Sequence, residues 1–377
     1  MAGIYIHIPF CRQACYYCDF HFSTSLKKKD ELLIALQKEL EVRKSEFENI
    51  KIETIYFGGG TPSLLSKDDL QSILETVYKN YAVKECPEIT LEANPDDLTK
   101  EKIMELSRSP INRLSIGVQS FFDADLKLMN RAHNSEEARV SLEETLHHFN
   151  NVSVDLIYGI PGASNEQWIE NIEIALGFSI PHISSYALTV EPKTALAAFI
   201  KKGIVKNVDD DKALEQFHLL KSKLENESFI HYELSNFGKE GFFSKNNSAY
   251  WQGKSYLGIG PSAHSFNGRQ RGWNVRNNSK YIKALQNNEL PIEIEDLTLT
   301  DQYNEYVMTG LRTIWGISLL KIEKDFGKLY LDYLNEQSQV FINQHLLYID
   351  DTHLRVTKKG QFLSDGIASQ LFKINLS

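Results

Sequence analysis

The first two hundred residues alternate regularly between strand patterns and helix patterns. Ile4, Ile6 and Ile8 alternate with other residues, which predicts a strand, and a helical pattern follows at 30–47. The unit then repeats, with strands expected at 54–57, 88–92, 113–118, 152–157 and 183–188. Helices between successive strands favour parallel strands with right-handed crossovers. The sequence therefore predicts an α/β fold, with a partial (β/α)6 TIM-like barrel over residues 1–205.

The regular alternation of strand and helix patterns ends after residue 205. Residues 206–292 contain a helix pattern followed by glycine- and asparagine-rich loops, and we expect an extension of the barrel there. Residues 293–377 read as a C-terminal, mainly helical domain. Its last part combines short strand patterns with a helix, as in a winged-helix-like unit.

Polar and glycine residues follow the predicted strands at one end. In (β/α) barrels the functional residues gather at the carboxyl ends of the strands. Those ends carry, in chain order, a cysteine-containing loop, a glycine run at 58–61, Glu92, Gln119, Asp155 and Ala187. We therefore expect a functional site at this rim.

Three of the four cysteines fall within eight positions. Four cysteines in 377 residues are too few for a disulfide framework, and the tight spacing Cys11-x3-Cys15-x2-Cys18 is typical of a metal or redox site. Three thiolates could hold a [4Fe–4S] cluster and leave one iron open. The alternative is a zinc site completed by His7 or His21. The fourth cysteine, Cys86, is expected to be a buried small residue.

The second predicted strand ends in Gly58-Gly59-Gly60-Thr61-Pro62. Glycines at a strand end let a ligand approach the backbone and expose N–H donors. A phosphate loop would continue with Gly-Lys-Ser or Gly-Lys-Thr, so a nucleotide triphosphate is disfavoured. A tight turn without a ligand is the alternative.

Charge and hydropathy restrict the partners. The chain has 41 Lys and Arg against 50 Asp and Glu, a net charge of −9, which disfavours a sequence-independent grip on nucleic acid. No apolar run approaches the roughly 18 residues of a membrane span, and the N-terminus lacks a secretion signal. We expect a soluble, cytoplasmic protein.

Together these motifs resemble the radical S-adenosylmethionine (SAM) superfamily, whose cysteine loop follows the first strand of a partial barrel. More narrowly, 7–11, 58–63 and 155–162 resemble the oxygen-independent coproporphyrinogen III oxidase family. The resemblance implies that Cys11, Cys15 and Cys18 ligate a [4Fe–4S] cluster. It also implies a set of residues that bind SAM, namely Tyr5, Gly59, Gly60, Thr61, Glu92, Gln119, Arg131 and Asp155, with Ala187 and His264 as weaker candidates.

Two subgroups of that family differ in the cysteine loop. The coproporphyrinogen dehydrogenases carry a fourth cysteine two positions after the third, where this chain has Phe20. The departure resembles the sister group, the HemW-type heme chaperones, which are thought to bind heme and pass it to acceptor proteins. The alternatives are a coproporphyrinogen III oxidase, a radical SAM enzyme with another substrate, and a zinc-stabilised structural protein. Catalysis is thus left open.

The chaperone group has a heme-binding His-Asn-x-x-Tyr-Trp motif, and this chain departs from it. The aligned stretch begins with Asn246 and ends with Tyr250 and Trp251. An amide is a poor axial ligand for heme iron, whereas imidazole and phenolate serve. The remaining candidates for that role are His231, Tyr232, Tyr250 and His264.

The resemblance also implies partners. These are heme or a porphyrin, heme-acceptor proteins, and an electron donor such as flavodoxin. A homodimer is one assembly that it allows.

Overall fold

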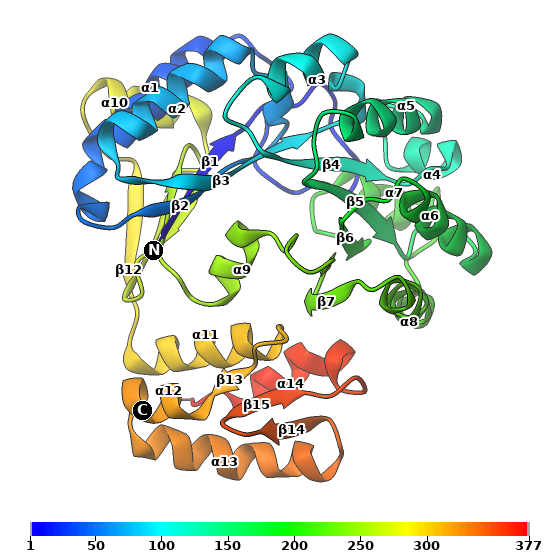
Figure 1. Cartoon of the computed structure of the whole chain (residues 1–377), viewed down its shortest axis with the longest axis vertical. Coiled ribbons are helices and arrows are strands. Elements are labelled where there is room, and N and C mark those ends of the chain that lie inside the picture. Colours follow the sequence, from blue (N-terminus) through cyan, green and yellow to red (C-terminus); the bar gives the residue numbers. More distant parts are fainter. Residues whose placement is uncertain (1, 375–377) are drawn as a thin grey trace.

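The computed structural model describes residues 2–374. A strongly curved sheet carries helices on its outer face, and a smaller domain lies across the open side of the curve (Figure 1). Six parallel strands form the centre of the sheet: β1 (Ala2–Ile8), β2 (Ile52–Gly59), β3 (Val83–Ala93), β4 (Arg113–Gln119), β5 (Val152–Tyr158) and β6 (His182–Ala187). The predicted partial (β/α)6 barrel is confirmed.

Helices connect these strands and cover the outer face of the sheet. They are α1 (Lys29–Val42), α2 (Lys67–Asn80), α3 (Lys100–Ser107), α4 (Asp123–Leu128), α5 (Ser135–Leu146), α6 (Asn165–Gly177) and α7 (Ala195–Lys201). Short 3-10 helices lie at Lys44–Phe47, Pro62–Leu64, Pro95–Asp97 and Gln361–Leu363. Helix α2 begins with a capping box, in which the Ser66 side chain accepts from Asp69 N–H and the Asp69 side chain accepts from Ser66 N–H.

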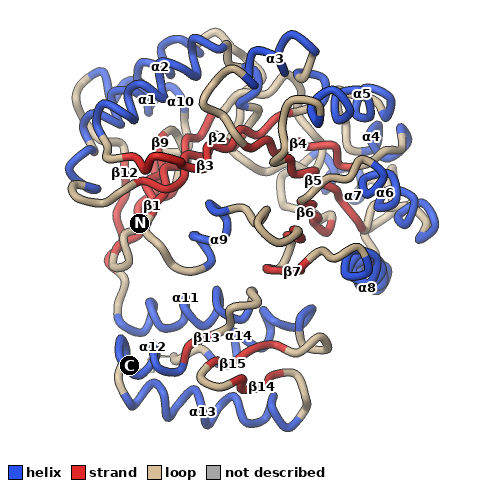
Figure 2. The backbone as a smooth tube through the Cα atoms, in the orientation of Figure 1, coloured by secondary structure: helices blue, strands red, loops and turns tan. Residues whose placement is uncertain are grey.

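Residues 206–292 extend the sheet at both edges. After α8 (Asp210–Asn226), strands β7 (Ile230–Glu233) and β8 (Asn236–Gly238) join the β6 edge. Beyond α9 (Lys245–Trp251), strand β9 (Tyr256–Ile259) pairs parallel with β1 at the other edge. The sheet continues through β10 (His264–Phe266), β11 (Gln270–Asn274) and, after α10 (Asn278–Gln286), β12 (Ile292–Asp296). The strands thus form one arc with an open inner face (Figure 2).

The C-terminal domain has its own core. Its elements are α11 (Leu299–Leu311), β13 (Ile317–Ser318), α12 (Leu319–Phe326), α13 (Lys328–Asn343), β14 (Leu347–Asp350), β15 (His353–Val356) and α14 (Ser364–Leu371). Tyr303, Ile322 and Leu334 are completely buried within it. The region is mainly helical, as predicted. Within the described residues, none of the helices has the length and apolar content needed to cross a membrane.

Alternation along β1 separates the two faces of the sheet. Ile4, Ile6 and Ile8 are completely buried and belong to the core beneath the helices. Tyr5 and His7 therefore point to the inner face. The prediction for Cys86 was wrong: it lies exposed in the early part of β3, because that part of the strand precedes the buried stretch beginning at Pro87.

A buried carboxylate ties the β9 edge to helix α1. Glu39 accepts hydrogen bonds from Gly260 N (2.9 Å), Asn274 Nδ2 (2.8 Å) and the Tyr281 hydroxyl (2.5 Å). Its other contact is an ion pair with Arg43 at 2.9 Å, and both side chains are almost completely buried. Since a buried charge is costly unless fully paired, these contacts stabilise the added strands against the barrel.

Replacing Glu39 by Ala should lower the free energy of unfolding by about 3–5 kcal/mol, because Gly260 N and the Tyr281 hydroxyl lose their buried acceptor. The buried Arg43 also loses one of its two carboxylate partners and keeps Glu46. Urea unfolding measures this. The control is Glu41→Ala on the exposed side of α1, which should change stability by less than about 0.5 kcal/mol. Equal losses in the two variants would contradict this account of the β9 edge.

Candidate functional site

The cysteine loop and the glycine turn are in direct backbone contact. Gly60 N donates to Ile8 O at 2.9 Å, and Thr61 N donates to Phe10 O at 2.7 Å. A Cβ atom on Gly60 would lie 2.6 Å from Phe10 O and 2.7 Å from Ile8 O. Only glycine allows this approach, which places the loop that begins at Cys11 over the end of β2.

The three clustered cysteines are half-buried, and none of them forms a disulfide. Cys18 N donates to Cys15 O at 3.3 Å, which closes the loop between them. Burial raises the pKa of the Cys11 thiol and raises that of Cys18 to about 11, and repulsion from the neighbouring thiols adds to both effects. A cation in this loop would reverse that effect, because it stabilises the thiolates.

The cysteine spacing allows two kinds of metal site, and the geometry of the donors distinguishes them. Among the described residues, no three Cys, His, Asp or Glu side chains lie close enough together to hold a single metal ion. A cubane cluster binds each thiolate at a separate iron, so its ligands need not converge on one point. Three soft thiols on one short loop therefore fit the ligand arrangement of a cubane cluster.

Arg131 joins the cysteine loop to the rim of the sheet. Its Nη1 donates to Cys15 Sγ at 3.3 Å, and its Nη2 donates to Asn94 Oδ1 and Gly117 O, both at 2.7 Å. Its Nε is buried and has no partner within the described residues. A buried guanidinium with an unused donor fits a carboxylate ligand at this rim.

Two half-buried carboxyl groups lie on the inner face. Glu92 accepts from the Tyr56 hydroxyl (2.8 Å) and from Gly59 N (3.1 Å), while Asp155 accepts from the Ser115 hydroxyl (3.2 Å). Burial raises the pKa of Glu92 to about 7 and that of Asp155 to about 6. Both groups can accept hydrogen bonds from an ammonium group or a hydroxyl, and Glu92 changes charge near neutral pH.

The other predicted SAM residues occupy different parts of the rim. Thr61 is buried, and its hydroxyl accepts from Asn94 Nδ2 at 3.2 Å. Gln119 is buried with φ of 70°, which is rare outside glycine. Ala187 is exposed at the end of β6. His264 lies away from Thr61, Gln119 and Ala187, on β10 at the extended edge of the sheet.

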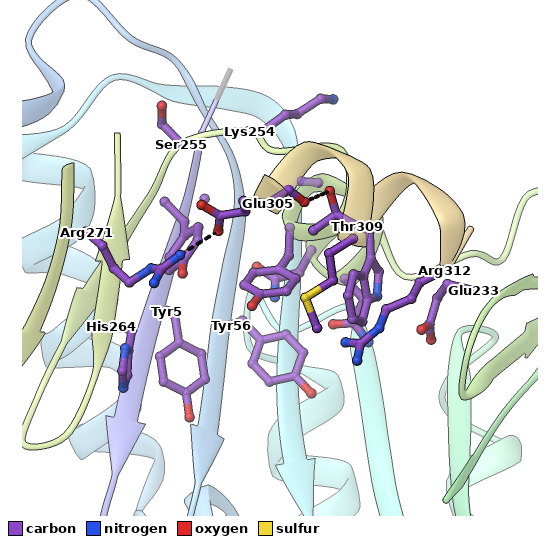
Figure 3. Close-up of a pocket in the computed structure, with 18 of the residues that line it drawn as sticks. Tyr5, Tyr56, Glu233, Lys254, Ser255, His264, Arg271, Glu305, Thr309 and Arg312 are labelled. Carbon is purple, nitrogen blue, oxygen red and sulfur yellow. Dashed lines mark hydrogen bonds and ion pairs between the residues drawn. The ribbon is translucent and has the colours of Figure 1, made fainter. Parts of the chain in front are cut away.

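A cavity of about 1100 Å³ lies between the inner face of the sheet, α9 and the C-terminal domain. Tyr5, Tyr56 and Glu92 form part of its wall, and Figure 3 shows the two tyrosines side by side, with His264 next to Tyr5. The rings of Tyr5 and Tyr56 stack with their centroids 6.0 Å apart. The rim and the cavity therefore share residues from β1, β2 and β3.

The four candidates for a heme ligand differ in whether they line the cavity. Tyr250 and His264 line it. His231 is buried outside it, stacked on Phe237 at 4.3 Å. Tyr232 is completely buried, and its hydroxyl bonds to His182 Nε2 at 2.7 Å.

Sequence reasoning missed the charged residues that reach the cavity from late in the chain. Arg271 pairs with Glu305 at 3.0 Å, as Figure 3 shows, and Arg312 lies 5.5 Å from the Trp251 ring. No motif marks these residues: the added strand β11 brings Arg271 to the site, and docking of the C-terminal domain brings Glu305 and Arg312.

Gly60→Ala should displace the cysteine loop and lower the free energy of unfolding by about 1–3 kcal/mol, because its Cβ would overlap two backbone carbonyls. Thermal unfolding measures the change. Gly177→Ala is the matched control, since a Cβ there meets no atom within 4 Å, and it should be neutral or slightly stabilising. Unchanged stability of Gly60→Ala would show that the loop does not depend on this contact.

Comparisons with known protein families agree with the two-part architecture. The family described as the Radical SAM superfamily matches residues 5–175, and the HemN C-terminal domain matches residues 297–363. Among solved structures, coproporphyrinogen III oxidase (HemN) from Escherichia coli superposes with a TM-score of 0.86, covering 99% of this chain and 90% of its own. At 22% identity, that likeness shows the fold alone.

Curated relatives match over nearly the whole chain. Heme chaperone HemW of Lactococcus lactis is 35% identical over 364 residues, covering 96% of this chain and 95% of its own. HemW of Bacillus subtilis is 32% identical, covering 97% and 98%. The mitochondrial radical S-adenosyl methionine domain-containing protein 1 of Mus musculus is 35% identical, covering 97% and 86%. The chain belongs to the radical SAM superfamily and, within it, to the HemW family.

Proposed function

We propose that this protein is a heme chaperone that binds heme in the cavity and transfers it to acceptor proteins. The observation that carries the proposal is the 31–35% identity, over nearly the full length, to bacterial proteins named heme chaperone HemW. The cavity supports it, because its volume of about 1100 Å³ is at the upper end of the range for sites of small organic ligands.

Membership of the radical SAM superfamily implies a [4Fe–4S] cluster and bound SAM. We propose that Cys11, Cys15 and Cys18 hold the cluster. When bound, the cluster supplies an open iron for SAM and an electron when it is reduced. Arg131 contacts Cys15 and keeps its charge beside the thiolates, which favours their deprotonated form.

The SAM site is proposed at the adjoining rim. The unused Nε of Arg131 would pair with the SAM carboxylate, and Glu92 and Asp155 would accept from its ammonium group and ribose hydroxyls. The hydrogen bond from Gly60 N to Ile8 O fixes the backbone of the glycine turn next to this site. The full proposed set is Tyr5, Gly59, Gly60, Thr61, Glu92, Gln119, Arg131 and Asp155, with Ala187 and His264 as weaker members.

The walls of the cavity suit a flat ligand with carboxylate side chains. Tyr5, Tyr56 and Tyr256 provide aromatic surface, while Arg271 and Lys254 provide positive charge at the wall. Heme combines an apolar ring with two propionates, so it can use both kinds of contact.

The alternative function is oxidative decarboxylation of coproporphyrinogen III. The likeness to HemN extends over the whole fold, but the curated relatives at 31–35% identity are named as chaperones. Phe20 stands where the dehydrogenases have a fourth cysteine, and its side chain is exposed at the cavity. These observations favour the chaperone.

The partners belong to the same proposal. We propose heme-acceptor proteins as recipients, an electron donor such as flavodoxin for the cluster, and the cytoplasm as the location. A homodimer is the proposed assembly. All four rest on the family resemblance.

Cys15→Ala should abolish the cluster, because two thiolates cannot hold a four-iron cube in place. Iron and sulfide assays on anaerobically purified protein measure this. Cys86→Ala is the matched control, since that cysteine is exposed on β3 away from the loop, and its iron content should equal that of the unaltered protein. A full iron complement in Cys15→Ala would refute the ligand assignment.

Hemin titrated into the purified protein should produce a saturable change in the Soret band at one equivalent, and the loaded protein should deliver heme to an apo-acceptor. The same protein incubated with coproporphyrinogen III, SAM and a reductant under anaerobic conditions should yield no protoporphyrinogen IX. Stoichiometric conversion without saturable hemin binding would instead support the oxidase alternative.

A further inference from the structure

Three histidines line the cavity, and two of them are engaged by the protein. His7 Nδ1 bonds to the Tyr5 hydroxyl (3.1 Å), and its Nε2 bonds to His21 O (3.0 Å). His21 donates from Nε2 to Asn278 Oδ1 at 2.6 Å, so one of its two ring nitrogens is engaged, and its ring stacks on His7. His264 is exposed to the cavity, and neither of its ring nitrogens has a hydrogen-bond partner within residues 2–374. A metal ligand needs such a free nitrogen lone pair.

The other candidates for an iron ligand are unsuited. Asn246 bears an amide, and its Oδ1 accepts from the Thr54 hydroxyl at 3.1 Å. Tyr250 reaches the cavity, but burial and the Glu305 carboxylate raise the pKa of its phenol, so the phenolate that iron requires is disfavoured. Burial and the Arg271 guanidinium lower the pKa of His264, which favours the neutral imidazole that binds iron.

The surroundings of His264 suit a porphyrin. In the paired strands β10 and β11, His264 lies opposite Trp273, and Phe266 lies opposite Arg271. Phe266 also pairs with Tyr256 on β9, so these side chains share one face of the sheet. That face carries an aromatic surface, one free imidazole and one guanidinium. Figure 3 shows His264 and Arg271 both directed into the cavity beside Tyr5.

We propose that His264 is the axial ligand of heme iron in this protein rather than a member of the SAM set, and that it takes the role for which Asn246 is chemically unsuited. The porphyrin ring lies along the face formed by β9, β10 and β11. One propionate pairs with Arg271 by exchanging with Glu305, which holds that guanidinium at 3.0 Å. The inference rests on the proposed heme-binding function and deepens it.

The test is hemin titration of His264→Gln, with the Soret position and the spin state from electron paramagnetic resonance as readouts. Glutamine keeps the polar side chain but lacks an imidazole. We expect the imidazole-ligated spectrum of the unaltered protein to be lost. His218→Ala is the matched control, because His218 is exposed on α8 outside the cavity, and its spectrum should be unchanged. In His264→Gly, added imidazole should restore the spectrum.

The outcomes separate this inference from the function on which it rests. Saturable hemin binding by the unaltered protein, with an unchanged spectrum in His264→Gln, would overturn the ligand assignment and leave the chaperone function standing. A loss in Tyr250→Phe alone would assign the phenol instead and also overturn it. Weaker SAM binding by His264→Gln, with unchanged heme spectra, would move the residue to the SAM site. Absence of hemin binding by the unaltered protein would refute the function itself.

Discussion

The close approach of Gly60 to the backbone of the first βα loop is the contact on which the rim depends. Two hydrogen bonds, from Gly60 to Ile8 and from Thr61 to Phe10, fasten the start of the cysteine loop to the end of β2. A side chain at Gly60 would occupy the position of those carbonyls. Arg131 bonds both to Cys15 Sγ and to Gly117 O on β4, so the loop is also fastened to the fourth strand. The glycine turn is thus a structural partner of the cysteines before any ligand binds.

The inner face of the sheet serves two sites with one set of side chains. Tyr56 donates to Glu92, and Tyr5 stacks on Tyr56 while it bonds to His7. These residues border the proposed SAM rim at one end and the proposed heme cavity at the other. Phe20 and its neighbours at the end of the cysteine loop also line the cavity. Cofactor and cargo would therefore meet a continuous wall, and a change on β1 or β2 would reach both.

Docking of the C-terminal domain supplies one wall of the cavity. Helix α9 lies between the sheet and this domain (Figure 1), and its Trp251 ring packs under Arg312. Arg312 is held in turn by two hydrogen bonds of 2.7 Å to Asp365 on α14. The added strands on which His264 and Arg271 stand are secured by the buried Glu39 network. Two sets of long-range polar contacts thus define the volume in which a large ligand could bind.

The sequence alone determined the barrel, the helical C-terminal domain, the cysteine loop and the glycine turn, because strand and helix periodicity and short motifs are local properties of the chain. It misjudged Cys86, since the general tendency of free cysteines to be buried does not tell where along β3 the buried stretch begins. It left four heme-ligand candidates open. The tertiary structure reduced them by burying His231 and Tyr232 and bringing His264 into the cavity. No sequence motif marked Arg271, Glu305 or Arg312 as part of the site. They reach the cavity only through the packing of segments that are distant in sequence, which no local pattern records.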